Sequence, residues 1–505
     1  MKQKWATLSR GWSVRPTQDG LELIGPERNL ALELSDPEIY RKKIASILLG
    51  SRIIREGLIS DDLAELLVSL NEQRILEYRN EKPPISALPK IEQILWKIRS
   101  TTTGTKGPIG IVYRLKSVES NLSRYLFAAV YESNGANKAE WAGGSDKDPL
   151  RAELKAIMEA LERWASGVIP EEELILCSSQ RLKGRALDPR QVIAYKPWQY
   201  LQKGFRLTPF SATRDYFWKE VLTFPEKKTY YLPADCIYYP VPKRLAPNPY
   251  TFANSSGIAA AFSFQEAIAG GIYEAIERDA FMLTWLNQMK RPRIKNATLP
   301  EIEKERIREL ERLGYELYFV DLTLDLAPVI LAIAVSYTRQ PALILGAASH
   351  FNLLTAISKA LGEVEHQFYW RLYHADNFYT LEKAEEVKII RDHMALYTSQ
   401  KHLAEAEFLW QGSEISCYKT PSVGKKQELE RLIELLESIG KTLVIVDLTP
   451  KLLKELGIWV VRCFPLGLVP ISFGHGMEPL AMPRIREFGG KKAGWGGRPY
   501  THPFA

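Results

Sequence analysis

The stretch "SFQEAIAGGIYEAIERDA", residues 263–280, decides how the rest of the chain is organised. As a helix of about 3.6 residues per turn, it places Glu266, Glu274 and Glu277 on one side and apolar residues on the other, toward a core. The pair Gly270-Gly271 costs a helix about 1 kcal/mol per glycine relative to alanine. We therefore expect another part of the backbone to come close to the helix at this pair.

The same spacing occurs in two more segments. The pattern A-x6-E-x-x-[EH]-[RQ] fits "AELKAIMEALER" (152–163), "AIAGGIYEAIER" (267–278) and "AISKALGEVEHQ" (356–367). The acids and the residues that follow them are Glu159, Glu162 and Arg163, then Glu274, Glu277 and Arg278, then Glu363, His366 and Gln367. A single helix of this kind is usually a solvated surface, whereas three matched copies favour acidic faces that meet around one cavity.

Carboxylates gathered on one face repel each other unless a cation lies among them. Hard divalent ions such as Mg²⁺ prefer oxygen ligands, and arginines beside the acids suit phosphate oxygens. The chain has no G-x-x-x-x-G-K-[ST] loop, so a nucleotide would have to be held through glutamate-bound metal. It also lacks the G-x-S-x-G, H-E-x-x-H and kinase H-R-D motifs.

The bulk composition is that of a globular enzyme rather than a membrane or nucleic-acid protein. Of 505 residues, 46% are hydrophobic and 25% charged, and the net charge of +7 is spread along the chain, which argues only weakly for nucleic acid. We see no signal peptide and no apolar run of about 20 residues, so no membrane span is expected. Four widely spaced cysteines form no zinc or redox motif and indicate a reduced, cytoplasmic protein.

The chain is expected to contain two domains of unequal size. Residues 1–78 combine the strand-like runs "GWSVRP", "GLELIG" and "LALELS" with amphipathic helices over 36–50 and 60–79, which suggests a winged-helix-like module. Residues 79–90 are Pro-rich and polar, as in a linker. Residues 91–505 alternate helices and strands, which predicts an α/β (α+β) body. Within it, "ERLGYELYFVDLT" recurs as "ESIGKTLVIVDLT", a repeated helix–glycine–strand unit of the core.

Several blocks together resemble the YcaO-domain family. They are "DPLRAELKAIMEALERWASG", "NSSGIAAAFSFQEAIAGGIYEAIERDAF", "ALGEVEHQFYWR" and the final "THPFA", and the resemblance covers roughly residues 91–505. It implies a body in which ATP and Mg²⁺ are held by glutamates on such helices. By position, the implied nucleotide-binding residues are Lys155, Glu159, Glu162, Arg163, Ser255, Glu266, Glu274, Glu277, Arg278, Gln367 and Arg371. The implied metal ligands are Glu159, Glu162, Glu266, Glu274 and Glu277.

Three positions depart from the family pattern. Lys155 stands where a serine is usual, Ser256 replaces the asparagine of the usual "SNG", and Ala505 replaces a final proline. The Gly-rich stretch before "THPFA" would otherwise resemble a frayed end. The resemblance implies instead that the terminus folds back into the active site, with His502, Pro503 and Ala505 as catalytic residues. Either the terminal carboxylate or His502, with a pKa near neutral, would accept a proton.

The resemblance implies an ATP- and Mg²⁺-dependent cyclodehydratase that converts Cys, Ser or Thr of a ribosomally made precursor peptide into azolines. The implied partners are the precursor peptide, with its leader and core, and a separate protein that presents the leader. The protein could also form a homodimer. Residues 1–78 would bind the leader as an added strand. Two alternatives stay open: a thioamide-forming relative, and a non-catalytic peptide- or DNA-binding protein whose winged helix carries Arg41, Lys42, Lys43, Arg52 and Arg55.

Overall fold

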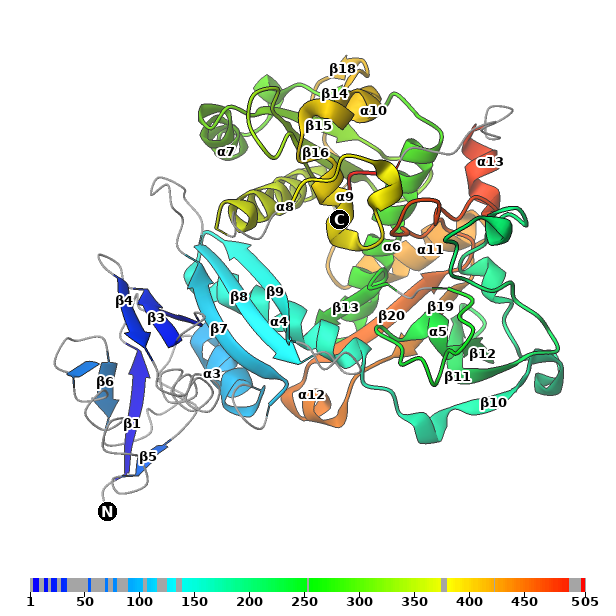
Figure 1. The fold of residues 1–505 in the computed structure, drawn as a ribbon, viewed down its shortest axis with the longest axis horizontal. Coiled ribbons are helices and arrows are strands. Elements are labelled where there is room, and N and C mark those ends of the chain that lie inside the picture. Colours follow the sequence, from blue (N-terminus) through cyan, green and yellow to red (C-terminus); the bar gives the residue numbers. More distant parts are fainter. Residues whose placement is uncertain are drawn as a thin grey trace. The chain divides into compact units, whose positions relative to one another are not determined.

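The computed structural model divides the chain into two compact units, residues 1–164 and 165–505, which are described separately (Figure 1). It describes residues 3–8, 13–16, 20–24, 29–33, 53–55, 69–70, 76–79, 90–102, 107–115, 125–132, 139–251, 254–373, 379–421, 423–489 and 501–504. The division at Trp164 falls inside a helix and not in the expected linker. The expected domain limits, 1–78, 79–90 and 91–505, stay a prediction.

The first unit begins with two small antiparallel sheets. One contains β1 (Gln3–Leu8), β5 (Ile53–Arg55) and β6 (Leu76–Arg79), and the other is the meander β2 (Ser13–Pro16), β3 (Gly20–Ile24) and β4 (Asn29–Glu33). The meander confirms the three strands expected there. The helix expected to run to residue 79 is wrong at its end, because Leu76–Arg79 pairs with β1 as a strand. Most of the two expected helices, over 36–50 and 60–79, lies outside the described residues.

A three-stranded sheet and two helices complete the first unit. The antiparallel strands are β7 (Ile109–Leu115), β8 (Tyr125–Glu132) and β9 (Ala139–Asp146), and the helices are α3 (Lys90–Thr102) and α4 (Pro149–Ser166). Gly144 of β9 lies so close to the α4 backbone that a Cβ there would collide with the carbonyl of Ala152. Helix α4, the first acidic copy, therefore lies directly on the last strand.

The second unit contains two antiparallel-rich sheets. The first has the order β10 (Ile175–Ser178), β11 (Asp215–Phe224), β19 (Leu443–Asp447), β20 (Trp459–Pro465), β13 (Ile258–Ala261), with β12 (Thr229–Pro233) also on β11. The second has the order β17 (Leu343–Ser349), β16 (Val329–Val335), β15 (Glu316–Asp321), β14 (Arg293–Ile294), β18 (Glu414–Ile415). Every residue of β16 and β17 is buried, as expected for strands in the centre of a core.

Helices fill the space around these sheets. They are α5 (Ala234–Ile237), α6 (Phe264–Leu286), α7 (Glu301–Arg312), α8 (Leu353–Tyr373), α9 (Ile390–Leu396), α10 (Leu403–Ala406), α11 (Glu428–Ser438), α12 (Lys451–Leu456) and α13 (Pro483–Gly489). Helix α6 contacts β13 and β20 of one sheet and β16 and β17 of the other, and α8 packs on β16 and β17. Helix α6, which carries the opening stretch, is thus the central element of the second unit (Figure 1).

The repeated helix–glycine–strand unit is confirmed. Helix α7 ends before Gly314, at φ +89°, and leads into β15; helix α11 ends before Gly440, at φ +68°, and leads into β19. Only glycine adopts this left-handed conformation readily, which explains its place in both copies. The copies also end alike, because Asp321 accepts a hydrogen bond from Thr323 N and Asp447 accepts one from Thr449 N.

The close backbone approach expected at the glycine pair is confirmed for one of its members. A Cβ on Gly271 would lie 2.6 Å from the carbonyl oxygen of Gly257 and 2.9 Å from Cys463 Sγ, whereas one on Gly270 would meet only Ala259 Cβ, at 3.0 Å. Gly271→Ala should therefore destabilise the protein by about 1–3 kcal/mol through overpacking against backbone. Gly270→Ala should be close to neutral, because Ala259 needs to move by only a few tenths of an ångström and helix propensity improves by about 1 kcal/mol.

Urea unfolding of the two variants checks this expectation, and each serves as the control for the other, since both lie in the same helix. Equal stabilities would show that the approach of β20 to α6 does not require glycine at position 271.

All four cysteines are free thiols. In the part of the chain that the structure describes, every helix is too short or too polar to cross a membrane.

Candidate functional site

Helices α6 and α8 bring acidic side chains together. Glu277 of α6 interacts with Glu274 of the same helix and with Glu363 and Lys359 of α8. Burial raises the pKa of Glu277 to about 8; Arg278 opposes this shift, and the charges of Glu274 and Glu363 add to it. The side chain of Glu277 is 12% exposed. A buried carboxylate beside two others is the arrangement that a divalent cation would stabilise.

Arg278 lies beside these acids. Its Nη2 is 3.5 Å from Glu274 Oε1 and its Nη1 is 3.6 Å from Glu277 Oε1. Its Nε and Nη1 are buried and make no hydrogen bond within the described residues. A buried guanidinium with unused donors suits an oxyanion such as phosphate, as expected for this position.

Glu363 also belongs to this acidic group, although it is not among the residues predicted for the site. It occupies the same position of the repeated pattern as Glu159 and Glu274, so the sequence carries the signal. Its place beside Glu277 depends on how α8 packs against the sheet that α6 also contacts. Lys359 is the second addition, and its charge acts on both Glu277 and His350.

The first acidic copy lies on α4, in the other unit. Glu159 Oε2 accepts a hydrogen bond of 3.0 Å from Gly143 N, and Arg163 lies 3.7 Å from Glu159. Lys155 donates to Asp146 Oδ2 at 2.7 Å and to Ser145 O at 3.0 Å. Glu162 is half-buried. These residues share one stretch of α4, and their approach to the acids of α6 stays a prediction.

Glu266 is separated from Glu274 by two turns, about 12 Å along the helix axis. It lies at the start of α6, where Ser263 Oγ accepts a hydrogen bond from Glu266 N at 3.2 Å and bonds to Glu266 Oε2 at 3.1 Å. Ser263 is the N-cap of α6, and its hydroxyl both accepts from the Glu266 backbone and donates to the Glu266 carboxylate, which gives Glu266 a structural role at the helix N-terminus. The structure does not bring Glu266 into the group around Glu277.

Three other predicted residues occupy different surroundings. Ser255 lies in the turn before β13, where its carbonyl accepts from Ile258 N. Gln367 Nε2 donates to the carbonyl of Leu345 in β17 at 2.8 Å, which fixes α8 on its sheet. Arg371 belongs to the last turn of α8, and its side chain lies outside the described residues.

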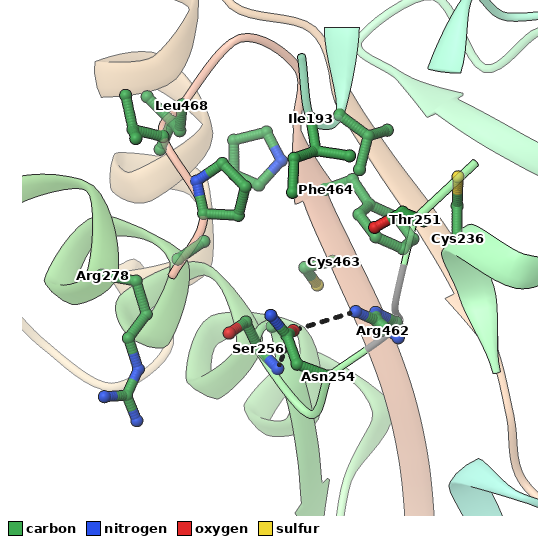
Figure 2. Close-up of a pocket in the computed structure, with 16 residues that line it drawn as sticks. Ile193, Cys236, Thr251, Asn254, Ser256, Arg278, Arg462, Cys463, Phe464 and Leu468 are labelled. Atoms are coloured by element: carbon green, nitrogen blue, oxygen red, sulfur yellow. Dashed lines mark hydrogen bonds between the residues drawn. The ribbon is translucent and has the colours of Figure 1, made fainter. Parts of the chain in front are cut away.

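A pocket lies between α6, β20 and the turn before β13. Figure 2 shows Asn254 joining Ser256 and Arg462 on its polar wall; Asn254 Oδ1 accepts from Ser256 N at 2.9 Å and from Arg462 Nη2 at 3.4 Å. Leu468 and neighbouring apolar residues form the opposite wall, and Arg278 also lines the pocket. The pocket thus connects the "NSSG" block with the arginine of the acidic group.

The segment 501–504 is folded and buried in the second unit, while Ala505 lies outside the described residues. Thr501 and His502 are fully buried, and Phe504 is 4% exposed. The guanidinium carbon of Arg278 lies 4.5 Å from the centre of the Phe504 ring, a cation–π contact. The end of the chain therefore touches the arginine of the acidic group.

The expectation of a near-neutral pKa for His502 is wrong. Burial, followed by the neighbouring His393, lowers the pKa of His502 well below its usual value, so the imidazole is neutral. Its Nε2 donates to the carbonyl of Ser472 at 2.7 Å. His502 therefore has the surroundings of an anchor. The catalytic roles of His502, Pro503 and Ala505 stay predictions.

The residues present fit Mg²⁺ bound to a nucleotide. Within the described residues, no group of three or more His, Cys, Asp or Glu side chains is placed so that it could hold a metal ion by itself. The donors around Glu277 are nevertheless all carboxylates, which Mg²⁺ prefers, and Mg²⁺ usually keeps several waters and phosphate oxygens as ligands, so a few protein carboxylates suffice.

These features define an α+β protein in which acidic helix faces are suited to a metal-bound nucleotide. The chain belongs to the YcaO family: residues 143–468 match the family model described as YcaO cyclodehydratase, ATP- and Mg²⁺-binding. Its cofactors are accordingly ATP and Mg²⁺, and it is an ATP-dependent enzyme. The family and the cofactors inferred from the sequence blocks are both confirmed.

Other comparisons agree on the fold. An uncharacterized protein of Methanothermobacter thermautotrophicus is 26% identical over 69% of this chain and 86% of its own length. A heterocyclase solved with substrate and cofactor is 21% identical to this chain, with a TM-score of 0.64. The match covers 75% of this chain and 52% of the heterocyclase, so this chain spans about half the length of that relative. The YcaO from Methanopyrus kandleri, solved with AMPPCP and Mg²⁺, is 17% identical with a TM-score of 0.54 over 78% and 92% of the two chains.

The raised pKa of Glu277 predicts a pH dependence of the metal-free protein. Between pH 4.5 and pH 8 this carboxyl ionises in the unfolded chain but stays protonated in the folded one. The folded state therefore binds more protons in this window, so the free energy of unfolding falls as pH rises and levels off above about pH 8. We expect Glu277→Gln to reduce this fall by an amount on the order of 2–4 kcal/mol.

Chemical unfolding at a series of pH values, with EDTA present, measures this difference between wild type and variant. Parallel stability curves for the two proteins would show that Glu277 ionises normally and is not buried in the folded state.

Proposed function

We propose that the protein is a peptide backbone cyclodehydratase that converts Cys, Ser or Thr of a ribosomal precursor peptide into thiazolines or oxazolines. The observation that carries this proposal is the contact of Arg278 with the acidic group on one side and with Phe504 on the other. One arginine would thereby contact both the acidic group that binds the nucleotide and the chain segment that serves peptide modification. A heterocyclase solved with substrate and cofactor and the heterocyclase TruD, at TM-scores of 0.64 and 0.52, support the proposal through their similar fold.

The reaction forms a ring and removes one water. The side-chain thiol or hydroxyl of the substrate adds to the preceding amide carbonyl and loses its proton, and the carbonyl oxygen becomes an oxyanion. When bound, Mg²⁺–ATP would supply the phosphoryl group with which this oxygen departs as phosphate. The amide nitrogen would lose its proton as the C=N bond of the azoline forms, and ADP would be the other product. The chemistry needs mainly positioning and charge stabilisation from the protein.

The chain's own residues would divide this work. Glu274, Glu277 and Glu363, together with Glu159 and Glu162 of α4, would hold the metal. Arg278 would bind phosphate oxygens with the donors that make no hydrogen bond among the described residues. Lys155, Arg163, Ser255, Gln367 and Arg371 are proposed to complete the nucleotide site. The segment ending in His502, Pro503 and Ala505 would present the proton acceptor for the attacking side chain. Because burial lowers the pKa of His502 well below its usual value, its imidazole is a weak base, and the acceptor is assigned to Ala505.

The partners belong to the same proposal. A precursor peptide would bind through its leader to residues 1–78, by adding a strand to one of the small sheets. The small sheets with strand orders β5–β1–β6 and β2–β3–β4 are the candidates for this pairing. A separate protein that presents the leader, and a homodimer, remain proposals.

Mass spectrometry of a peptide encoded next to this protein's gene, incubated with the protein, ATP and Mg²⁺, tests the proposal. We expect the loss of one water per modified residue, dependent on ATP. Exchange of oxygen for sulfur in the presence of a sulfur donor would assign the thioamide reaction instead. No mass change with neighbouring peptides, despite ATP binding, would contradict the proposal.

A further inference from the structure

A histidine of α9 lies at the centre of the contacts that hold segment 501–504. His393 is fully buried, and its Nε2 accepts a hydrogen bond of 2.8 Å from Gly474 N. Since Nε2 is an acceptor, the proton of the neutral ring lies on Nδ1, which donates to the carbonyl oxygen of His502 at 2.7 Å. Both ring nitrogens are thus used, and His393 connects the loop at Gly474 to the backbone of the segment.

Three further hydrogen bonds fix the same segment. Tyr397 Oη donates to the carbonyl oxygen of Thr501 at 2.7 Å, and His475 Nδ1 lies 2.9 Å from Thr501 Oγ1. His502 Nε2 donates to Ser472 O at 2.7 Å. We call the four residues His393, Tyr397, Ser472 and His475 the tail clasp. Because it binds backbone and side-chain atoms of consecutive residues, it allows only one register.

Ring packing supports this arrangement. The imidazoles of His393 and His502 stack with centroids 4.2 Å apart at an interplanar angle of 24°. Burial lowers the pKa of His393 to about 4 and lowers that of His502 as well, so two neutral rings face each other without charge repulsion. The stacking of the two uncharged imidazoles is therefore stable at neutral pH.

The register sets which residue meets the acidic group. With His502 held by the clasp, Phe504 packs against Phe281 at 4.7 Å between ring centroids and lies under Arg278 at 4.5 Å. Arg278 is the residue that also lies 3.5–3.6 Å from Glu274 and Glu277. A shift of the segment by one residue would remove the aromatic ring from Arg278.

We infer that His393 is a positioning residue, which through its two hydrogen bonds holds segment 501–504 in the register that places Phe504 on Arg278. The inference rests on the proposed function, since the step that it serves is modification of the peptide. His393 touches neither the acids around Glu277 nor the pocket of Figure 2 in the described residues. Its effect should therefore appear in peptide modification and not in nucleotide binding.

The test compares His393→Leu, His393→Asn and Asp392→Asn in the full chain. Leucine removes both hydrogen bonds, whereas asparagine can still donate to the His502 carbonyl. Asp392→Asn is the control, because the described hydrogen bonds of Asp392 come from Lys388 N, Ile389 N and Tyr379 and none reaches segment 501–504. The charge of Asp392 also acts on His393, and asparagine removes this charge while keeping an accepting oxygen. We expect kcat for the peptide to fall about 10- to 100-fold for leucine, since a displacement of about 1 Å can cost 100-fold. Asparagine should restore part of this loss.

Two further readouts separate the inference from the proposed function. Hydrogen exchange of the peptide that contains residues 501–504 should be faster in His393→Leu and unchanged in Asp392→Asn, and the affinity for AMPPCP with Mg²⁺ should be unchanged in both. Equal kcat in all three variants, or unchanged exchange at 501–504 in His393→Leu, would overturn the inference. If the wild type modifies no peptide, the proposed function fails, and the exchange rates alone still decide whether His393 holds the segment. If the leucine variant does not fold, His393→Asn carries the same comparison.

Discussion

Glu277→Gln should lose Mg²⁺-dependent ATP hydrolysis by about 100-fold or more while the fold stays intact. Even residues that only support a metal ligand are typically worth roughly 10- to 100-fold. Glutamine has nearly the same shape but cannot replace the charge that a cation requires. Because Glu277 is buried with a pKa of about 8, replacing it by a neutral amide should leave the metal-free protein as stable as the wild type at pH 8, or more so.

ATP turnover and chemical unfolding, measured on the same preparations, check this expectation. Glu434→Gln is the control, since Glu434 lies on α11 with a side chain that is 60% exposed and pairs only with Arg431 among the ion pairs described. Full hydrolysis by Glu277→Gln would contradict its assignment as a metal ligand.

Deletion of Phe504 and Ala505 is expected to slow peptide modification about 100-fold or more and to spare the binding of AMPPCP with Mg²⁺. Phe504 covers Arg278, and its removal both exposes the guanidinium to water and takes away the proposed proton acceptor at Ala505. General-base catalysis alone is worth about 100-fold or more. The loss of a buried ring should also lower the free energy of unfolding by about 3–5 kcal/mol.

Mass spectrometry for the rate and calorimetry for nucleotide binding measure the two effects separately. Phe504→Leu, which keeps Ala505 and an apolar side chain, should lose much less activity than the deletion. Unchanged modification by the shortened protein would remove this segment from the mechanism.

Local patterns predicted much of the fold. The repeated spacing of acidic residues located α4, α6 and α8, and Gly314 and Gly440 marked where two helices end, because both signals act within a few residues. The strand β6 was missed where a helix was expected to continue to residue 79, since Leu76–Arg79 is fixed by pairing with β1, about 70 residues away in the chain.

The candidate site was predictable in part. Glu274, Glu277 and Arg278 share one helix, so their common face follows from spacing alone. Glu363 joins them only because α6 and α8 both pack against β16 and β17, and this arrangement is a property of the whole core. The neutral state of His502 depends first on burial, which no local pattern records, and then on His393, 109 residues earlier in the chain.

The central claim is that acids of separate helices bind the metal of a nucleotide. Its most direct test is the anomalous signal of Mn²⁺, which accepts the same oxygen ligands as Mg²⁺, in crystals grown with AMPPCP. The account predicts Mn²⁺ peaks bound by carboxylate oxygens of α6 and α4, from Glu274 or Glu277 together with Glu159 or Glu162, with Arg278 on a phosphate oxygen. A nucleotide bound with Mn²⁺ elsewhere, and these glutamates facing water, would contradict it.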